Sequence, residues 1–379
     1  MPATPPDSRP TVAVDLRALV PEATGIGVYT RSLLAALAAR ERPLRYVGMA
    51  HAAPRGAGAV EAAGIPVEVQ PAKLGVWWQQ VELPRRLARG DVDLFFSPLQ
   101  TLPLRCPVPA VVTVHDLTVL LRPEDHTFKV VWSQLPFLGR SLARARRVIA
   151  VSHATAGDLL RQFPDCRGKV RVVHEGVAPE FRPADAETVA RIRRGLGAPR
   201  GYLLFVGTLE PRKNVAALLT AWESLVAGDP EFPPLLLAGG AGWHSRRLAR
   251  RIEALRPLGL RHLGRLEEDR LVELFQGATA FAYPSLHEGF GLPLLEAMAC
   301  GVPCVTSDVS SLPEVAGGAA LTVDPHDAAA LAAALGRLVA DRGLAAELAA
   351  RGRQRAAAFT WPRAAAETEE TLREALAAG

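Results

Sequence analysis

The chain has 379 residues, of which 49% are hydrophobic and 22% are charged, with a formal net charge of +5 at pH 7. This composition is typical of a globular protein, and the absence of an apolar run of ~20 residues argues against a membrane-spanning chain. The length exceeds one ordinary hydrophobic core, so two domains are expected. Residues 1–10 lack an apolar signal core and are expected to form a disordered lead.

Charge is distributed unevenly along the chain. Residues 1–178 contain 22 Lys/Arg and 15 Asp/Glu, a net of +7, whereas residues 179–379 contain 22 and 24, a net of −2. The basic half suits an anionic partner, such as a lipid-phosphate acceptor or an acidic membrane surface. The alternative is that arginine is simply used on solvated faces. A nucleic-acid partner is not expected, because no binding motif or aromatic-interleaved basic stripe appears.

The four cysteines, at positions 106, 166, 300 and 304, suit a reducing cytoplasm better than a disulfide framework. Cys300 and Cys304 have the spacing of a metal-ligand pair, but no second Cys/His pair accompanies them. We therefore interpret them as packing residues and predict no metal site.

Short apolar runs alternate with amphipathic segments, a pattern that predicts parallel sheets with crossover helices. The expected strands of the first half are 11–16, 45–50, 66–70, 92–97, 110–115, 147–152 and 170–174. Those of the second half are 202–207, 234–238, 260–264, 279–284, 303–307 and 320–323. A proline-marked linker at 176–183 separates the halves, and helices are expected at 327–341, 344–358 and after 362. The fold class is thus α/β, with two doubly wound domains at 11–178 and 179–358 that bind ligands at the carboxyl ends of their strands.

A glycine pair follows the first expected strand, at Gly25 and Gly27. The spacing is similar to a dinucleotide fingerprint, but the third glycine is missing and no acidic residue follows a second strand at the usual distance. As a signal for a dinucleotide cofactor it is therefore weak.

The strand expected at 110–115 ends in His115, followed by Asp116. A histidine at the carboxyl end of a parallel strand points toward the ligand crevice, where a neutral imidazole can hydrogen-bond a hydroxyl group. Asp116 could orient the imidazole or the acceptor. A single histidine at a strand end is more often structural, and only its combination with the motifs below favours a functional role.

Residues 129–147 combine aromatic and aliphatic residues with Lys and Arg, which suits a membrane surface. Pro136 is expected to interrupt the segment, and the other interpretation is that most of its apolar residues pack on the sheet.

The strand expected at 202–207 leads to Gly207 and then to Arg212 and Lys213 at a helix start. Arg212 offers a planar fork of donors, Lys213 a point charge, and the helix start adds backbone amides, a combination that suits a diphosphate. The alternative is a charged helix start on the surface.

The strand expected at 279–284 is followed by Glu288, a glycine-flanked turn and a helix that carries Glu296. Gly289 and Gly291 allow the backbone amides to turn outward at a helix N-terminus, which favours bound negative charge. Two carboxylates eight positions apart can then each contact hydroxyl groups of one ligand. Two surface acids in an ordinary strand–loop–helix connection are the alternative.

Residues 288–303 resemble the Glu-x7-Glu signature of the retaining nucleotide-sugar glycosyltransferases of family 4, which have the GT-B fold of two Rossmann-like domains facing each other across a cleft. The resemblance extends over residues 11–379. The pattern from Val14 to Thr30, together with 115–117, is most similar to mannosyltransferases of surface-polysaccharide assembly, and this favours GDP-mannose as the donor.

The resemblance implies a role for each matching residue. His115 lies at the reacting carbon with Asp116 nearby, and Glu288 holds the donor sugar. The loop glycines at 25 and 27 face the donor phosphates. The remaining donor-binding residues are Gly207, Arg212 and Lys213 for the diphosphate, Gly289, Phe290, Gly291 and Leu292 around the sugar, Glu296 for the ribose, and Arg265 and Leu266 for the nucleobase.

One position departs from the family pattern. Many members carry an arginine directly after the glycine of the diphosphate loop, where this chain has Thr208, so the role of Arg212 is less secure than that of Lys213.

The resemblance also implies that no metal or other cofactor is bound, and that a final helix at 359–379 returns to the N-terminal domain.

The expected function is transfer of a sugar from a nucleoside diphosphate to a hydroxyl acceptor in glycan, polysaccharide or glycolipid synthesis, in the cytoplasm or at the inner face of the cell membrane. Three alternatives remain: a nucleotide-sugar epimerase, a phosphorylase or sucrose-synthase-like transferase, and a non-catalytic protein that binds nucleotide sugars.

Overall fold

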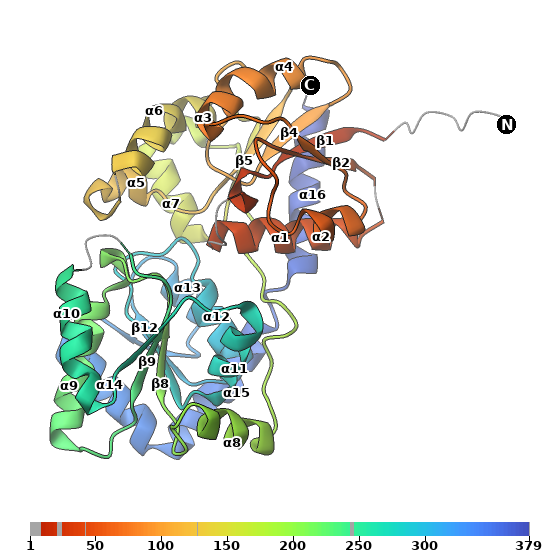
Figure 1. Cartoon of the computed structure of the whole chain (residues 1–379). Helices are drawn as coiled ribbons and strands as arrows, with labels where there is room; N and C mark the ends of the chain where they lie inside the picture. The colour runs from red at the N-terminus through yellow and green to blue at the C-terminus, as the bar shows by residue number, and fades with distance from the viewer. Residues whose placement is uncertain (1–8, 21–24, 42, 127, 243–245, 379) are drawn as a thin grey trace. The chain divides into compact units, whose positions relative to one another are not determined.

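The computed structural model describes residues 9–20, 25–41, 43–126, 128–242 and 246–378 (Figure 1). Most of the lead expected at 1–10 therefore lies outside the described residues. The chain forms two compact units. Unit 1 comprises residues 1–121, 128–176 and 361–379, and unit 2 comprises 122–127 and 177–360. The chain thus changes unit at 176/177 and 360/361, and the short segment 122–127 groups with unit 2 although it falls within the range 11–178 expected for the first domain.

Unit 1 contains a seven-stranded sheet in the order β3-β2-β1-β4-β5-β6-β7. Its strands are β1 (Thr11–Asp15), β2 (Arg45–Ala50), β3 (Val67–Val69), β4 (Leu94–Ser97), β5 (Ala110–Val114), β6 (Arg147–Ala150) and β7 (Val170–Val172). All neighbours pair in parallel; Val12, for example, lies opposite Tyr46 on one side and Leu94 on the other. The seven strands predicted from apolar runs are confirmed. Apolar runs mark such strands because helices cover both faces of a parallel sheet.

Helices cover both faces of this sheet (Figure 1). The helices are α1 (Gly25–Ala38), α2 (Ala57–Ala62), α3 (Gly75–Trp77), α4 (Leu83–Leu87), α5 (Thr118–Leu121), α6 (Phe128–Arg144), α7 (His153–Gln162) and α16 (Trp361–Ala377). The last helix, α16, packs on α1 and on β6, so the C-terminal segment belongs to unit 1. On the other face, Trp78, Leu138 and Leu159 enter one buried apolar cluster with the sheet.

Unit 2 contains a six-stranded parallel sheet in the order β10-β9-β8-β11-β12-β13. Its strands are β8 (Leu203–Val206), β9 (Leu235–Ala238), β10 (Arg261–Gly264), β11 (Ala280–Tyr283), β12 (Cys304–Ser307) and β13 (Leu321–Val323). The strand order reverses between β8 and β11, and such a switch point is where ligands bind in open parallel sheets. The six predicted strands of the second half are confirmed.

Five helices of unit 2 connect these strands as crossovers (Figure 1): α9 (Val215–Gly228), α10 (Arg246–Leu255), α11 (Glu268–Gly277), α12 (Leu292–Ala299) and α13 (Leu312–Ala316). Helix α8 (Ala186–Gly195) precedes β8, and α14 (Ala328–Ala340) and α15 (Arg342–Ala356) follow β13. The two helices expected at 327–341 and 344–358 correspond to α14 and α15. Cys300 and Cys304 are both buried and not disulfide-bonded.

Two local expectations are corrected by the structure. Pro136 does not interrupt the helix, since α6 continues from Phe128 to Arg144 with the proline inside it. Pro136 is exposed, so water can satisfy the carbonyl that loses its helical partner, while Leu138 and Leu142 anchor the following turns in the core. Gly25 and Gly27 lie in the first turn of α1 and not in a loop.

None of the described helices combines the length and the apolar character that a transmembrane span requires.

Candidate functional site

Two loops of unit 2, one after β8 and one after β11, meet at the switch point of its sheet. The first follows β8 and forms a 3-10 turn over Pro211–Lys213. Asn214 then takes a left-handed conformation with φ 54° and begins α9. Its side-chain amide donates to the carbonyls of Pro284 (3.1 Å) and Pro325 (2.7 Å), which ties this loop to the loops after β11 and β13. The turn is therefore fixed by its neighbours as well as by its own sequence.

Four charged side chains form a cluster between these loops, which we call the charge cluster: the buried Glu210, Lys213 and Glu288 and the half-buried Arg212. Lys213 Nζ lies 2.5 Å from Glu288 Oε1, and Arg212 NH1 lies 2.9 Å from Glu288 Oε2. Arg212 Nε contacts Glu210 Oε1 at 2.8 Å, and Lys213 Nζ also donates to the Tyr283 hydroxyl at 2.7 Å. The two cations and two carboxylates balance one another.

Burial decides the electrostatics of this cluster. Desolvation alone would raise the pKa of Glu288, but the positive charges of Lys213 and Arg212 outweigh it and lower that pKa from 4.5 to about 2. Burial and the charge of Arg212 lower the pKa of Lys213, and burial together with Glu288 raises the pKa of Tyr283. Glu288 is therefore ionised throughout the physiological pH range.

The turn that presents Glu288 is held by two serines from the loop after β12. The backbone N–H of Glu288 donates to Ser310 Oγ at 2.9 Å. The buried Ser311 hydroxyl contacts the carbonyls of Glu288 (3.0 Å) and Phe290 (2.7 Å). Gly291 closes the turn with φ 109°, a conformation that residues with side chains rarely adopt, and caps α12. The Glu288 backbone is thus fixed from a neighbouring strand end.

The other residues predicted for donor binding in unit 2 line the same edge of the sheet. Glu296 lies in α12 and is 9% exposed. Phe290 is buried with its ring packed edge-on against Phe359. Gly207 directly follows β8, Leu292 begins α12, and Arg265 and Leu266 directly follow β10. Arg212, Lys213 and Glu288 are in direct contact with one another.

In unit 1, His115 follows β5 and contacts two oxygens of its own unit. Nε2 lies 2.9 Å from the carbonyl oxygen of Pro98, and Nδ1 lies 3.2 Å from Glu175 Oε1. A carbonyl can only accept, so Nε2 carries a proton, and the contact with Glu175 then requires a second proton on Nδ1 or on the carboxyl group. The Tyr29 ring packs edge-on against the imidazole at 4.7 Å.

Asp116 lies next to His115 and accepts hydrogen bonds from the backbone N–H of Thr118 (2.9 Å) and from its hydroxyl (2.5 Å), so it caps the start of α5. Gly25 and Gly27, also predicted for the site, lie in the first turn of α1. The contact between His115 and Glu175 was not predicted and is added by the structure.

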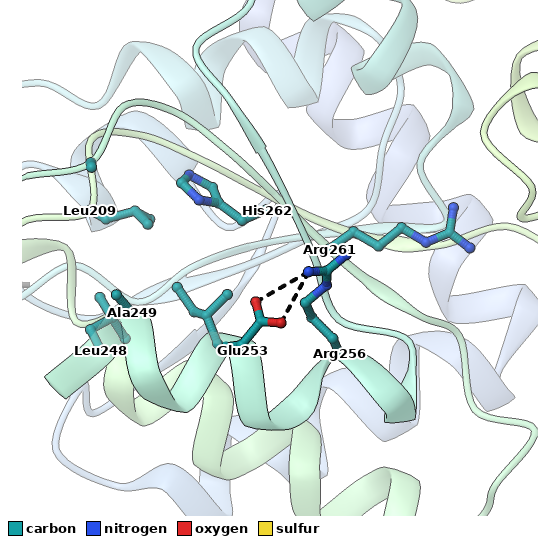
Figure 2. A pocket seen from close by; sticks show the side chains of 9 residues that line it. Leu209, Leu248, Ala249, Glu253, Arg256, Arg261 and His262 are labelled. Carbon is teal, nitrogen blue, oxygen red and sulfur yellow. Dashed lines mark hydrogen bonds and ion pairs between the residues drawn. The ribbon is translucent and has the colours of Figure 1, made fainter. Parts of the chain in front are cut away.

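A cavity of about 500 Å³ lies beside the loop that follows β8 (Figure 2). Leu209 and the α10 residues Leu248 and Ala249 line its apolar part. Its polar groups are engaged within the protein: Arg256 pairs with Glu253 at 3.0 Å, and His262 contacts the carbonyl of Gly239 at 2.9 Å. The charge cluster is the stronger candidate site because its ionic groups are largely buried and converge on one point.

The motifs did not single out four residues with a part in this geometry: Glu175, Glu210, Ser310 and Ser311. Glu210 lies between Gly207 and Arg212 in the loop after β8, and Glu175 follows β7. The position of each near a strand end was a signal from which a site residue could have been predicted. Ser310 and Ser311 act through backbone groups of another loop, a pairing that no local pattern shows.

Comparison with known proteins agrees with this geometry. Residues 189–355 match the family described as glycosyl transferases group 1, and residues 23–181 match glycosyltransferase family 4. The chain is 35% identical over 291 residues to the O-antigen chain mannosyltransferase B of Escherichia coli, covering 75% of this chain and 76% of that protein. It is 31% identical over 265 residues to the serotype-specific mannosyltransferase WbdA of Escherichia coli, covering 67% of this chain and only 32% of WbdA.

The fold has solved counterparts. The structure of HepE from Anabaena in complex with UDP and glucose superimposes with a TM-score of 0.77 at 19% identity, covering 97% of this chain and all of that chain. At this identity the likeness concerns the fold, which is GT-B. With the two family matches and the mannosyltransferase relatives, it follows that the chain is a glycosyltransferase and belongs to glycosyltransferase family 4 (group 1).

Proposed function

We propose that the protein is a retaining mannosyltransferase that transfers mannose from GDP-mannose to a hydroxyl group of a glycan or lipid-linked acceptor. Two of its relatives carry the name mannosyltransferase, one of them for an O-antigen chain, which supports both the sugar and the class of acceptor. Retention of configuration follows from the family resemblance of the Glu288–Glu296 stretch.

The charge cluster is the observation that carries the proposal. Transfer breaks the bond between the sugar C1 and the phosphate oxygen, and a new bond forms between C1 and the acceptor oxygen. The acceptor proton passes to the departing nucleoside diphosphate, on which negative charge develops. Arg212 and Lys213 are fixed beside each other at the strand end and would meet that charge, which lowers the barrier.

Glu288 and Glu296 would contact the hydroxyl groups of the donor, the first on the mannose and the second on the ribose. In unit 1, we propose that His115 acts beside the reacting carbon, with Glu175 holding the imidazole in one orientation. We further propose that no metal ion takes part, as the family resemblance implies.

The test is a panel of nucleoside diphosphate sugars incubated with the purified protein, with release of nucleoside diphosphate and donor binding measured together. Glu288→Ala is the test variant, and Glu223→Ala is the matched control, because Glu223 forms an exposed ion pair with Arg251 in the same unit. We expect GDP-mannose to be bound and slowly hydrolysed by the control and not hydrolysed by Glu288→Ala.

Other results would change the conclusion. Turnover of a different donor would replace mannose or guanosine in the proposal, and accumulation of an epimerised donor would indicate an epimerase. If no donor is bound and none is turned over, the glycosyltransferase site is refuted. The anomeric configuration of the product, read by NMR, tests retention.

We also propose a cytoplasmic location with peripheral contact to an anionic membrane through one face of α6. Phe128, Trp132 and Leu135 recur at helical spacing on this face and are 78%, 70% and 36% exposed. Arg140 follows on the same helix and is exposed. Exposed aromatic residues beside cationic ones suit the interface of a negatively charged bilayer.

Sedimentation with vesicles tests this contact. We expect binding to vesicles that contain phosphatidylglycerol, weaker binding to neutral phosphatidylcholine vesicles, and loss of binding in Trp132→Ser. Leu258→Ser is the control, since Leu258 is 48% exposed in unit 2. Equal binding by Trp132→Ser and by the control would exclude α6 as the contact surface.

A further inference from the structure

A third contact on His115 comes from α1, in addition to those of Pro98 and Glu175. Tyr29 is buried, and its ring lies 4.7 Å from the imidazole at an angle of 87°. Its hydroxyl lies 3.2 Å from the hydroxyl of Thr113, which stands in β5 two residues before His115. Burial raises the pKa of Tyr29, so this hydroxyl stays protonated. Tyr29 therefore contacts the end of β5 at two points.

Tyr29 is held in turn by the first residue of the last helix. Trp361 begins α16 and is 6% exposed, and its ring lies 5.9 Å from that of Tyr29 at 66°. Helix α16 packs on α1, so this ring contact is part of a longer interface between the two helices. Aromatic rings attract each other at centroid separations of about 4.5–7 Å. Tyr29 thus connects the last helix of unit 1 with His115 of the same unit.

The Tyr29 ring restrains the imidazole where its hydrogen bonds do so only in part. The backbone of His115 is fixed separately, since the Thr155 hydroxyl donates to the His115 carbonyl at 3.1 Å. The ring nitrogens lie 2.9 Å from the Pro98 carbonyl and 3.2 Å from Glu175, and the second distance is at the long end of the hydrogen-bond range. A ring held in this way needs a further contact to keep one orientation. The His115 side chain is 14% exposed, so a substrate can still reach it.

We propose that Tyr29 and Trp361 are positioning residues, which hold the His115 imidazole in the orientation that transfer requires. The consequence for catalysis rests on the proposed transferase function, in which His115 acts beside the reacting carbon. Both aromatic side chains are buried and act through the histidine. Loss of either ring should therefore slow the chemical step and leave donor binding unchanged. A catalytic group misplaced by about 1 Å can cost roughly 10²-fold in rate.

Steady-state hydrolysis of GDP-mannose by the full chain measures this effect. In Tyr29→Leu, which removes the ring, we expect kcat to fall roughly 10- to 100-fold while KM changes by less than about twofold. Trp361→Leu leaves the ring beside the histidine but removes its support, so kcat should fall roughly tenfold. This second variant keeps the test open if Tyr29→Leu does not fold. Tyr29→Phe and Trp361→Phe each keep an aromatic ring and should retain kcat within about threefold.

Trp78→Leu is the matched control for damage to the core of unit 1. Trp78 is fully buried in the apolar cluster on the face of the sheet away from α16, and its Nε1 donates to Gln70. Its replacement should also destabilise unit 1 but keep kcat within about threefold. A loss of kcat in Trp78→Leu as large as that in Trp361→Leu would overturn the inference, because any damage to the core would then lower activity.

Nitrogen-15 NMR of the histidine rings observes the orientation directly, and His115→Asn identifies the His115 signals by their loss. We expect a slowly exchanging proton on Nε2 in the unmodified protein and in Tyr29→Phe, since Nε2 donates to the Pro98 carbonyl. In Tyr29→Leu and Trp361→Leu this proton should exchange rapidly with solvent. Unchanged His115 signals in both leucine variants would overturn the inference.

The two measurements separate this inference from the proposed function. If the unmodified protein neither binds nor hydrolyses GDP-mannose, the proposed donor reaction fails, whereas the His115 signals still decide whether Tyr29 and Trp361 hold the ring. If GDP-mannose is hydrolysed and both leucine variants keep the kcat of the unmodified protein, the transferase function stands and the positioning role is refuted.

Discussion

Replacing Glu288 with glutamine should destabilise unit 2 in a way that depends on pH. The pKa of this carboxyl falls from 4.5 to about 2 on folding, because the cations beside it outweigh the cost of burial. At ~1.36 kcal/mol per unit, this shift corresponds to about 3 kcal/mol of stability near neutral pH. The side chain is buried, so solvent screening does not reduce this value. Glutamine would also leave Lys213 and Arg212 without their shared counter-ion, a further cost.

The direction of the pH dependence follows from the sign of the shift. A carboxyl whose pKa is lowered by folding contributes its full stability above the unfolded value of 4.5 and loses it as the pH falls toward 2. The difference between Glu288→Gln and the unmodified protein should therefore be largest near pH 7 and shrink between pH 4.5 and 2.

Hydrogen exchange of peptides from β8 and β11 is the appropriate assay, because it reports the opening of unit 2 separately from that of unit 1. Glu223→Gln is the control: Glu223 and its partner Arg251 are both partly exposed, so removal of this ion pair should cost less than about 1 kcal/mol. A loss below about 1 kcal/mol in Glu288→Gln, or a loss of the same size at pH 7 and pH 3, would refute the reasoning.

Four further predictions concern activity and local stability. Lys213→Ala should lower donor turnover roughly 10²-fold or more in a nucleotide-release assay, since a fixed charge at the leaving group is lost. Glu175→Ala should lower kcat for transfer with little effect on the donor KM, while Glu175→Gln, which keeps an acceptor oxygen for His115 Nδ1, should retain most activity; equal losses in both variants would mean that the negative charge matters. Ser311→Ala should destabilise unit 2 by about 1–2 kcal/mol, measured by hydrogen exchange, because two buried carbonyls lose a donor. Treatment with EDTA should leave transfer unchanged, and a loss restored by added Mg²⁺ or Mn²⁺ would disprove metal-independent chemistry.

The sheets could be predicted from the sequence because their central strands are buried on both faces and largely apolar along their length. The strand-end position of Arg212, Lys213 and Glu288 followed from the same pattern, since a parallel sheet brings its carboxyl ends to one edge. Their direct contact did not follow, because it depends on which loops the switch point between β8 and β11 brings together.

Local patterns failed where tertiary contacts decide the outcome. Pro136 was expected to interrupt the segment 129–147, but buried leucines in the following turns keep α6 continuous. The glycines at 25 and 27 were interpreted as a loop, yet glycine is also tolerated in a first helical turn, where they lie. Ser310 and Ser311 support Glu288 from more than twenty positions away, a relation that sequence spacing does not encode.

Because Glu288 already accepts from Lys213 and Arg212, the protein carries its own substitute for the anion that we expect at this place. If the diphosphate of the donor binds these two cations, as we propose, it would exchange with the Glu288 carboxylate, and its net gain in binding would be small. The same exchange would run in reverse after transfer, when the returning carboxylate would help the product to leave. Such a site would favour rapid cycling over tight retention of the nucleotide.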